Sequence, residues 1–203
     1  AADVRHELLR HRIHGRGRRA LLKMTTVEPI RNKSDIKKVE KVLAKQSQRD
    51  LMLFVLGTNC GLRISDLLSL NVGDVRNKTH IQIVEKKTGK FKKFPINDRL
   101  KPMIEDFVKG RRNAEPLFLS HWRHRLDRVT AYYLIRDACE KAGLQERIGT
   151  HSMRKTFGYH HYQQFKDVVI LQKIFNHSSP QITLRYIGVE QDQIDYSYSN
   201  FIL

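Results

Sequence analysis

The sequence predicts a mainly α-helical fold with one small antiparallel β-sheet, an α+β arrangement. Apolar residues recur at intervals of three and four through most of the 203-residue chain, which is the period of an amphipathic helix. Two short runs, residues 79–84 and 92–96, read instead as strands, and a glycine-containing turn joins them as in a β-hairpin. A chain of this length has room for one good-sized domain and a small appendage.

The first segment, residues 1–24, is predicted to be a separate basic region. It holds seven Lys or Arg residues and three His residues, with only a weak helical repeat. One interpretation is a basic arm that follows nucleic-acid phosphates. The other is an added or upstream leader before a natural start at Met24.

Residues 25–188 are expected to form the main domain. Ser34 suits the N-cap of a first helix that places Val39 and Leu43 on its apolar face. A second helix, residues 50–59, is apolar nearly all round and should be buried; it stops at Cys60-Gly61. After the hairpin, whose turn is residues 85–90, further helices are expected over residues 98–111, 128–142, 151–164, 168–175 and 179–187.

The charge of the chain favours a polyanionic partner. Lys and Arg outnumber Asp and Glu by 38 to 21, a formal charge of +17. Charge alone does not separate DNA from RNA or acidic lipid.

No run approaches the roughly 18 to 20 apolar residues that span a bilayer, and no apolar signal region follows the basic N-terminus. We therefore expect no membrane partner and a cytoplasmic, nucleoid-associated protein.

The cysteines and histidines do not indicate a metal site. Cys60 and Cys139 fall within apolar helical patterns without paired spacing, which predicts buried free thiols. Ten histidines, including His160-His161, raise the alternative of a zinc or magnesium hydrolase. The spacings and carboxylate clusters that such sites need do not occur. We expect neither a metal nor a cofactor.

Six residues spread along the chain can together surround and attack one phosphodiester: Arg63, Lys87, His151, Arg154, His177 and Tyr186. A guanidinium meets the charge on the non-bridging oxygens with a planar fork of donors. A tyrosine can attack phosphorus if a neighbouring acceptor favours its phenolate. His151 and Arg154 are three residues apart and therefore share a helical face. Asp66, three residues beyond Arg63, is expected to hold that guanidinium in place.

The segments that carry these residues resemble the catalytic domain of the tyrosine recombinases, the integrase family of site-specific DNA recombinases. They are Gly61-Leu62-Arg63, Thr150-His151-Ser152-Met153-Arg154 and Asn176-His177 through Tyr186. The resemblance runs from about Arg31 to Tyr186, and the joint order and spacing make it specific. It implies the tyrosine recombinase catalytic-domain fold and strand cleavage through a 3′-phosphotyrosine, without metal or ATP. It also suggests a bacterial, phage or mobile-element origin.

The resemblance implies a role for most of the six residues. Tyr186 is the nucleophile, because it alone of seven tyrosines follows the second histidine by nine residues. His151 assists it, and His177 donates to a non-bridging oxygen. Asn176 stands where the family more often has glycine, and asparagine tolerates the left-handed backbone that a helix end needs there.

Lysines crowd the predicted hairpin, so the general acid that protonates the leaving 5′ oxygen is harder to assign. Lys87 is preferred because Lys87-Thr88-Gly89 matches the turn of several integrases. Four other lysines are expected to contact DNA: Lys86, Lys90, Lys92 and Lys155.

The resemblance also sets expectations about assembly. Family members act on double-stranded DNA as homotetramers, and we expect a monomer in solution. Members usually carry a core-binding domain of roughly a hundred residues before the catalytic one, so this chain is either a fragment or a short member. The tail, residues 189–203, should either contact a neighbouring protomer or fold back as core cover. The alternative functions are a non-catalytic DNA-binding accessory factor on the same fold and a type IB topoisomerase-like enzyme.

Overall fold

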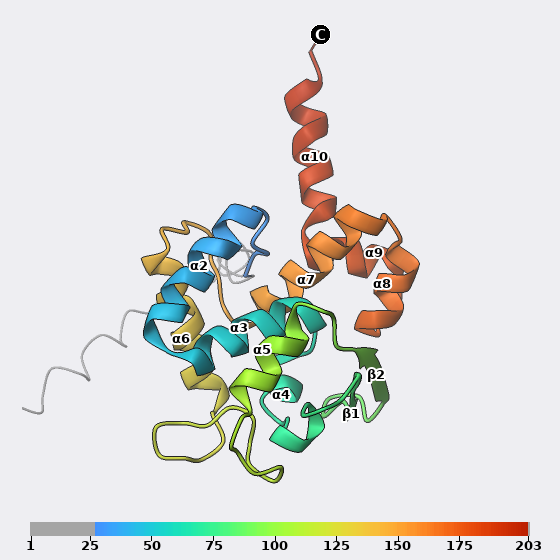
Figure 1. Cartoon of the computed structure of the whole chain (residues 1–203). Helices are drawn as coiled ribbons and strands as arrows, with labels where there is room; N and C mark the ends of the chain where they lie inside the picture. The colour runs from blue at the N-terminus through green and yellow to red at the C-terminus, as the bar shows by residue number, and fades with distance from the viewer. Residues whose placement is uncertain (1–26, 203) are drawn as a thin grey trace, which may run out of the picture.

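The computed structural model describes residues 27–202, so the basic region predicted over residues 1–24 lies outside the described residues. The described part is mainly helical and contains one two-stranded antiparallel sheet, as the sequence predicts. In chain order (Figure 1) its elements are α2 (Lys33–Gln46), α3 (Gln48–Cys60), α4 (Ile64–Leu67), the 3-10 turn η1 (Val72–Asp74), β1 (His80–Val84), β2 (Phe91–Pro95), α5 (Leu100–Phe107), α6 (Arg128–Lys141), α7 (Thr150–Phe165), α8 (Val168–Phe175), α9 (Pro180–Ile187) and α10 (Val189–Asn200).

Helix α3 forms the centre of the core. Its side chains from Leu53 to Leu56 are completely buried, which explains why the sequence of this helix is apolar nearly all round. Helices α2, α5, α6 and α7 pack around it. A second, smaller cluster joins α8 and α9 through buried Leu171, Phe175 and Ile187. Helix α7 packs against both α3 and this second cluster and therefore connects the two parts of the domain.

The β-hairpin extends from one side of this helical core. Strands β1 and β2 pair antiparallel, with His80 opposite Pro95 and Val84 opposite Phe91. Gly89 takes a left-handed φ of 67° in the turn, as its position there requires. Strand β2 begins one residue before the predicted run.

Several element boundaries differ from the sequence prediction, and one helix was not predicted. The expected N-cap Ser34 lies inside the first turn of α2, because the carbonyl of Asn32 already accepts hydrogen bonds from the amides of Asp35 and Ile36. Helix α5 ends at Phe107 rather than at residue 111, and Gly110 beyond it adopts a left-handed φ of 72°. The tail, which was not assigned a secondary structure, contains helix α10.

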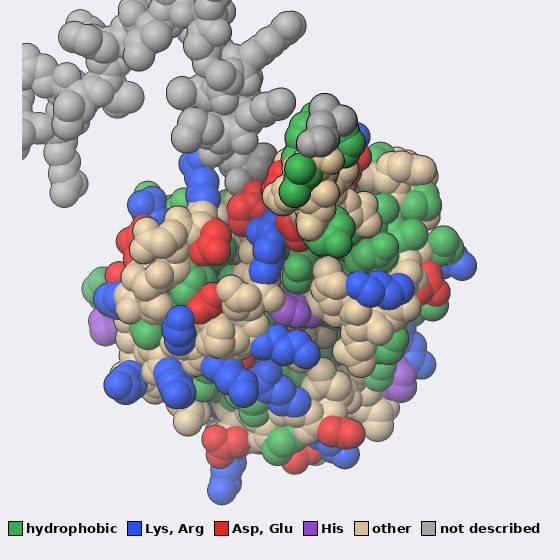
Figure 2. All heavy atoms as spheres, turned by 90° about the horizontal axis from the view of Figure 1, so that it is seen from above, with side chains coloured by type: hydrophobic (Ala, Val, Ile, Leu, Met, Phe, Trp, Pro, Cys, Tyr) green, Lys and Arg blue, Asp and Glu red, His purple; other side chains and the backbone are tan. Residues whose placement is uncertain are grey.

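Helix α10 projects away from the rest of the molecule (Figure 1). An ion pair of 3.0 Å between Arg31 and Asp192 anchors its first turns. Beyond that point the tail does not cover the core: four of its large side chains are 70–88% exposed, namely Tyr196, Tyr198, Phe201 and Ile202. Core cover is therefore limited to the start of the tail, where Val189 is buried in the second cluster, while residues 193–202 are exposed. The space-filling view (Figure 2) shows hydrophobic side chains on one side of the base of this projection and acidic and basic side chains on the other.

Other sequence-level expectations concern single residues and helix length. Cys60 and Cys139 are free thiols and both are buried, as predicted. None of the helices within residues 27–202 combines the length and the apolar character that crossing a membrane requires.

Candidate active site

All six predicted active-site residues line one hollow of about 1140 Å³. Its walls come from the start of α4, the turn of the hairpin, the start of α6, the first turns of α7, and the α8–α9 junction with α9. The residues that the structure brings together there are Arg63, Lys87, His151, Arg154, His177 and Tyr186. Segments far apart in the sequence thus contribute to a single concave surface.

Arg63 is placed by the sharp turn between α3 and α4. Gly61 ends α3 with a left-handed φ of 61°, and a Cβ there would lie 2.5 Å from the ring of Phe157, so only glycine fits. The Arg63 guanidinium forms an ion pair of 2.9 Å with Glu85, whose side chain is 3% exposed. Glu85 also accepts a hydrogen bond of 2.8 Å from the Thr88 hydroxyl. Burial would raise the pKa of Glu85, but Thr88 and Arg63 outweigh it and leave that pKa lowered.

Asp66 does not hold Arg63, and this prediction is wrong. The Asp66 carboxylate is completely buried and accepts a hydrogen bond of 2.9 Å from the backbone amide of Lys86. It therefore ties the hairpin turn to α4. Glu85, which lies at the start of that turn, contacts the Arg63 guanidinium instead. Sequence proximity favoured Asp66, but the short helix α4 directs its carboxylate to the hairpin backbone.

Arg154 is buried between two chain segments, with only 3% of the residue exposed. One Nη donates to the carbonyl of Gly61, and the other donates to the carbonyl of Phe175 at 2.9 Å. The guanidinium carbon also lies 4.3 Å from the centroid of the Phe175 ring. Burial lowers the pKa of Arg154, yet a guanidinium keeps its charge at any working pH. A guanidinium has five N–H donors, so the two carbonyls leave others available to a ligand.

Tyr186 packs edge-on against His177, with ring centroids 5.1 Å apart, and against Phe175 at 5.5 Å. Burial raises the pKa of Tyr186, while the positive charges of Arg154 and Arg63 act in the opposite direction. Asn176, which ends α8, has φ 56° and ψ 47°. The predicted left-handed turn before His177 is therefore confirmed.

His177 is held by a threonine of α9. Its Nδ1 lies 3.0 Å from Oγ1 of Thr183, a side chain that is completely buried. The pKa of His177 falls to about 4, because burial and the charges of Arg154 and Arg63 disfavour the imidazolium. At neutral pH the ring is therefore uncharged. The Thr183 hydroxyl also lies 3.3 Å from the Ser179 carbonyl, so whether its one hydrogen points to Ser179 or to His177 decides which ring nitrogen carries the proton.

His151 lies exposed at the rim of the hollow, in the first turn of α7. Desolvation and the nearby charges of Arg154, Lys155 and Arg128 lower its pKa. The lowered pKa favours the neutral imidazole, which is the form that can accept a proton.

The predicted lysines divide into two groups. Lys86 and Lys87 are exposed on the hairpin turn at the hollow, and exposed Lys90 donates a hydrogen bond of 2.7 Å to Asn176. Lys92 instead points inward and donates to the carbonyl of Ile174 at 3.0 Å, and burial and the charge of Arg154 lower its pKa to about 8.

Lys155 is also turned inward. Only 6% of it is exposed, and its Nζ lies 5.3 Å from the centroid of the Tyr186 ring. Lys92 thus follows the inward side of β2, and Lys155 follows the buried face of α7. The expected contact of these two lysines with DNA stays a prediction.

Sequence reasoning missed two residues that support the site, Glu85 and Thr183. Both are ordinary in the sequence, although Thr183 lies six residues after His177, within the first turn of α9. Within residues 27–202 the structure contains no group of three or more His, Cys, Asp or Glu side chains arranged to hold a metal ion.

Comparison with known proteins places this chain in a family. The model of the phage integrase family matches residues 31–193. "Probable integrase/recombinase YoeC" of Bacillus subtilis is 46% identical over 179 residues, which cover 88% of this chain and 98% of that protein. "Tyrosine recombinase XerA" of Pyrococcus horikoshii is 30% identical over 160 residues, 76% of this chain and 55% of that protein. The chain thus spans nearly all of the first relative and about half of the second.

Solved structures share the fold at low sequence identity. The crystal structure of XerA recombinase superposes with a TM-score of 0.68 at 19% identity and covers 88% of this chain and 66% of that one. A lambda integrase dimer bound to a COC′ core site gives a TM-score of 0.66 at 18% identity, over 80% of this chain and 49% of that one. These two structures support the fold.

Proposed function

Because the chain belongs to the phage integrase family of tyrosine recombinases, we propose that it cuts and rejoins DNA strands through a covalent 3′-phosphotyrosine. The observation that carries this proposal is the position of Tyr186, which lines the same hollow as two arginines and two histidines. Such a set of groups matches what a phosphodiester needs when a phenol attacks it. The reactions served would be integration, excision or inversion of a mobile element.

In the first step the Tyr186 oxygen attacks the scissile phosphorus as the phenol loses its proton to His151. The neutral imidazole of His151 can accept that proton, and Tyr186, whose pKa is raised by burial, enters the step as a protonated phenol. The bond from phosphorus to the 5′ oxygen breaks, and Lys87 supplies the proton that this oxygen takes up. Arg63, Arg154 and His177 donate to the non-bridging oxygens, where charge accumulates. Attack by a free 5′ hydroxyl reverses these transfers and rejoins a strand.

Energy is conserved in the phosphotyrosine bond, so the proposed reaction requires neither ATP nor a metal. We further propose that the protein is monomeric in solution and tetrameric on two duplexes, with α10 contacting a neighbouring protomer. The exposed apolar end of α10 supports such a contact. A lambda integrase tetramer bound to a Holliday junction is among the structures that share the fold.

Two alternatives share the fold and are separated by simple assays. An accessory DNA-binding factor would bind duplexes without forming a covalent adduct. A type IB topoisomerase-like enzyme would relax supercoiled plasmid as a monomer and give no recombinant product. Trapping of adducts on a library of nicked duplexes, followed by a recombination assay on the selected site, distinguishes all three.

Cleavage is expected to persist in EDTA, while binding should weaken steeply with salt. The candidate site charges are all supplied by side chains, and each phosphate neutralised by Lys or Arg releases counterions, with a slope of roughly −0.9 per contact on a log–log plot. Adduct formation with and without chelator and anisotropy of labelled duplex across a salt series measure the two effects. Loss of cleavage in EDTA, restored by zinc or magnesium, would overturn the metal-free mechanism.

Replacing Thr183 with valine is expected to slow cleavage about tenfold, which is the contribution of roughly one hydrogen bond. Oγ1 of Thr183 lies within hydrogen-bonding distance of both Nδ1 of His177 (3.0 Å) and the Ser179 carbonyl (3.3 Å). For neutral His177 to donate from Nε2 while Nδ1 stays hydrogen-bonded, the single hydroxyl hydrogen must turn from Ser179 to Nδ1, and valine has no such hydrogen. Thr183→Ser should restore the rate, because serine keeps the hydroxyl. The ring-nitrogen NMR shifts of His177 should report a changed tautomer mixture in the valine variant alone. An unchanged tautomer would remove Thr183 from this positioning role.

A further inference from the structure

The chain's only tryptophan, Trp122, lies on a short turn whose C-terminal end borders the candidate active site. Residues 118–126, here named the finger, fold back on themselves: the Leu126 amide donates to the Phe118 carbonyl at 2.9 Å, and the Ser120 amide donates to the His124 carbonyl at 2.7 Å. Phe118 and Leu126 at its base are buried. The tip is exposed throughout and consists of His121, Trp122, Arg123, His124 and Arg125.

The finger is fixed to the domain at its base. Arg49 from α3 donates to the Leu119 carbonyl at 2.7 Å. Arg125 donates to the carbonyl of Leu68 at the end of α4 and to the Asn71 side chain, each at 2.7 Å. These bonds make the tip a projection with a held base rather than a free loop.

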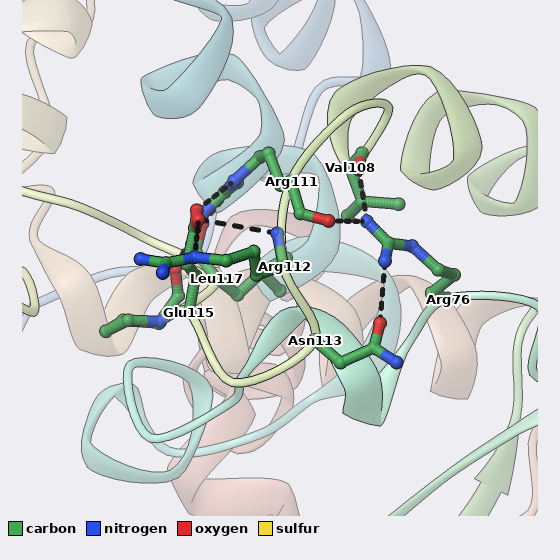
Figure 3. Close-up of polar contacts among 8 residues, drawn as sticks. Arg76, Val108, Arg111, Arg112, Asn113, Glu115 and Leu117 are labelled. Atoms are coloured by element: carbon green, nitrogen blue, oxygen red, sulfur yellow. Dashed lines mark hydrogen bonds and ion pairs between the residues drawn. The ribbon is translucent and has the colours of Figure 1, made fainter.

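The segment that leads into the finger is held in the same way (Figure 3). Arg111 donates to the carbonyls of Pro116 and Leu117 at 2.6 and 3.0 Å. Arg76 reaches across from the end of η1 and donates to the Asn113 side chain at 2.6 Å. Both ends of the finger therefore start from anchored backbone.

The finger also forms part of the hollow. Arg125, Leu126 and the two residues after them, Asp127 and Arg128, line the same cavity as Tyr186. Asp127 uses its carboxylate to cap α6 through the amides of Val129 and Thr130. The acid at this edge is thus already engaged, and the net charge of the finger and its flank is positive.

The tip combines an unusual exposed aromatic with a free cation. Trp122 is 78% exposed, although a side chain of this size normally buries most of its surface. Arg123 adopts a left-handed φ of 60°, a conformation that is unfavourable for a residue with a Cβ. No carboxylate pairs with Arg123 among the residues that the structure describes. A protein partner would bury the tip in an interface core, where charged residues are depleted, whereas a polyanion would bind the Arg123 guanidinium.

We propose that the finger is a DNA-contacting element in which Trp122 packs against the duplex beside the scissile phosphate and Arg123 binds a backbone phosphate. This rests on the proposed function, because it takes the hollow as the place of the scissile phosphate. Apolar side chains on rigid projections pack against sugars and base steps in the minor groove, and arginines next to them hold the phosphates. The finger would then fix the distance between the bound duplex and Tyr186.

Tryptophan emission tests this directly, since it arises from one residue. Acrylamide quenching of the full 203-residue protein is measured without DNA and with a 30-base-pair duplex at low salt. Anisotropy of a labelled copy of the duplex reports binding. Trp122 is expected to lose accessibility several-fold on binding. Trp122→Ala should weaken binding about tenfold, and Arg123→Gln should reduce the salt slope by about one. Phe165→Ala, an exposed aromatic away from the hollow, is the matched control.

The outcomes separate the finger from the proposed function. If the duplex binds by anisotropy but quenching of Trp122 is unchanged, the finger does not contact DNA, although the recombinase proposal stands. If Trp122→Ala and Phe165→Ala weaken binding equally, the effect is not specific to the finger, and the inference fails. If no duplex binds at all, both proposals fail. Protection of Trp122 only on addition of a second copy of the chain would identify a protein contact instead and overturn the inference.

Discussion

A Tyr186→Phe variant is expected to form no covalent protein–DNA adduct while binding duplex DNA as tightly as the parent. The change deletes one oxygen and no charge, and without that oxygen no bond to phosphorus can form. The phenyl ring keeps its packing against His177 and Phe175, so the hollow should keep its shape. Adducts trapped on nicked duplexes and anisotropy of labelled duplex measure the two quantities separately.

The matched control is Tyr133→Phe, which removes the same oxygen from a 60% exposed tyrosine on α6. It should form adducts at the parental rate. Adducts that persist in Tyr186→Phe would transfer the nucleophile to another tyrosine, and peptide mapping of the adduct would identify it. Loss of DNA binding together with adducts would show that the variant is misfolded, which thermal melting checks.

The sequence predicted helices and strands well where the repeat of apolar residues agreed with the residues that begin or end an element. Helix α8 has the predicted bounds, and the Cys60-Gly61 stop and the left-handed Asn176 were readable because each needs one residue type at one position. Helix α10 was missed because it does not bury an apolar face on this domain: most of its residues are exposed. Helical periodicity reports packing, so a helix without a packing partner gives a weak signal.

The candidate site was predictable as a set of residues but not as a set of contacts. The motifs that carry the family resemblance identified six residues, all of which line the hollow. It did not reveal that Glu85, rather than Asp66, reaches Arg63, since the hairpin turn brings Glu85 there from more than twenty positions away. Nor did it show that Lys92 and Lys155 point inward, because a lysine's four-carbon stem suits a buried path as well as a surface one.

Arg154→Lys is expected to reduce the rate of adduct formation by about 10² to 10³, the usual cost of removing one preorganised donor from a charge-stabilising site. Lysine keeps the positive charge, but its ammonium cannot bind the carbonyls of Gly61 and Phe175 and still present a fork of donors to a phosphate. Single-turnover cleavage of a nicked duplex measures the rate, and anisotropy measures affinity, which should change little because the charge is retained.

The contribution of Arg154 is distinguished from general basicity by Arg185→Lys. Arg185 directly precedes Tyr186, but its side chain is 74% exposed and pairs with Glu190 outside the hollow. Both variants replace an arginine with lysine, so a difference between their cleavage rates must come from where each arginine lies. Arg185→Lys should therefore cleave at close to the parental rate. Equal losses in both variants would show that the cleavage rate depends on arginine near Tyr186 in general, and the bridging position of Arg154 would not explain it. Arg154→Lys could also lose activity by unfolding at the assay temperature, and a thermal melt of the variant would show this. In that case the assay is repeated at a lower temperature, where the loss of cleavage rate should remain.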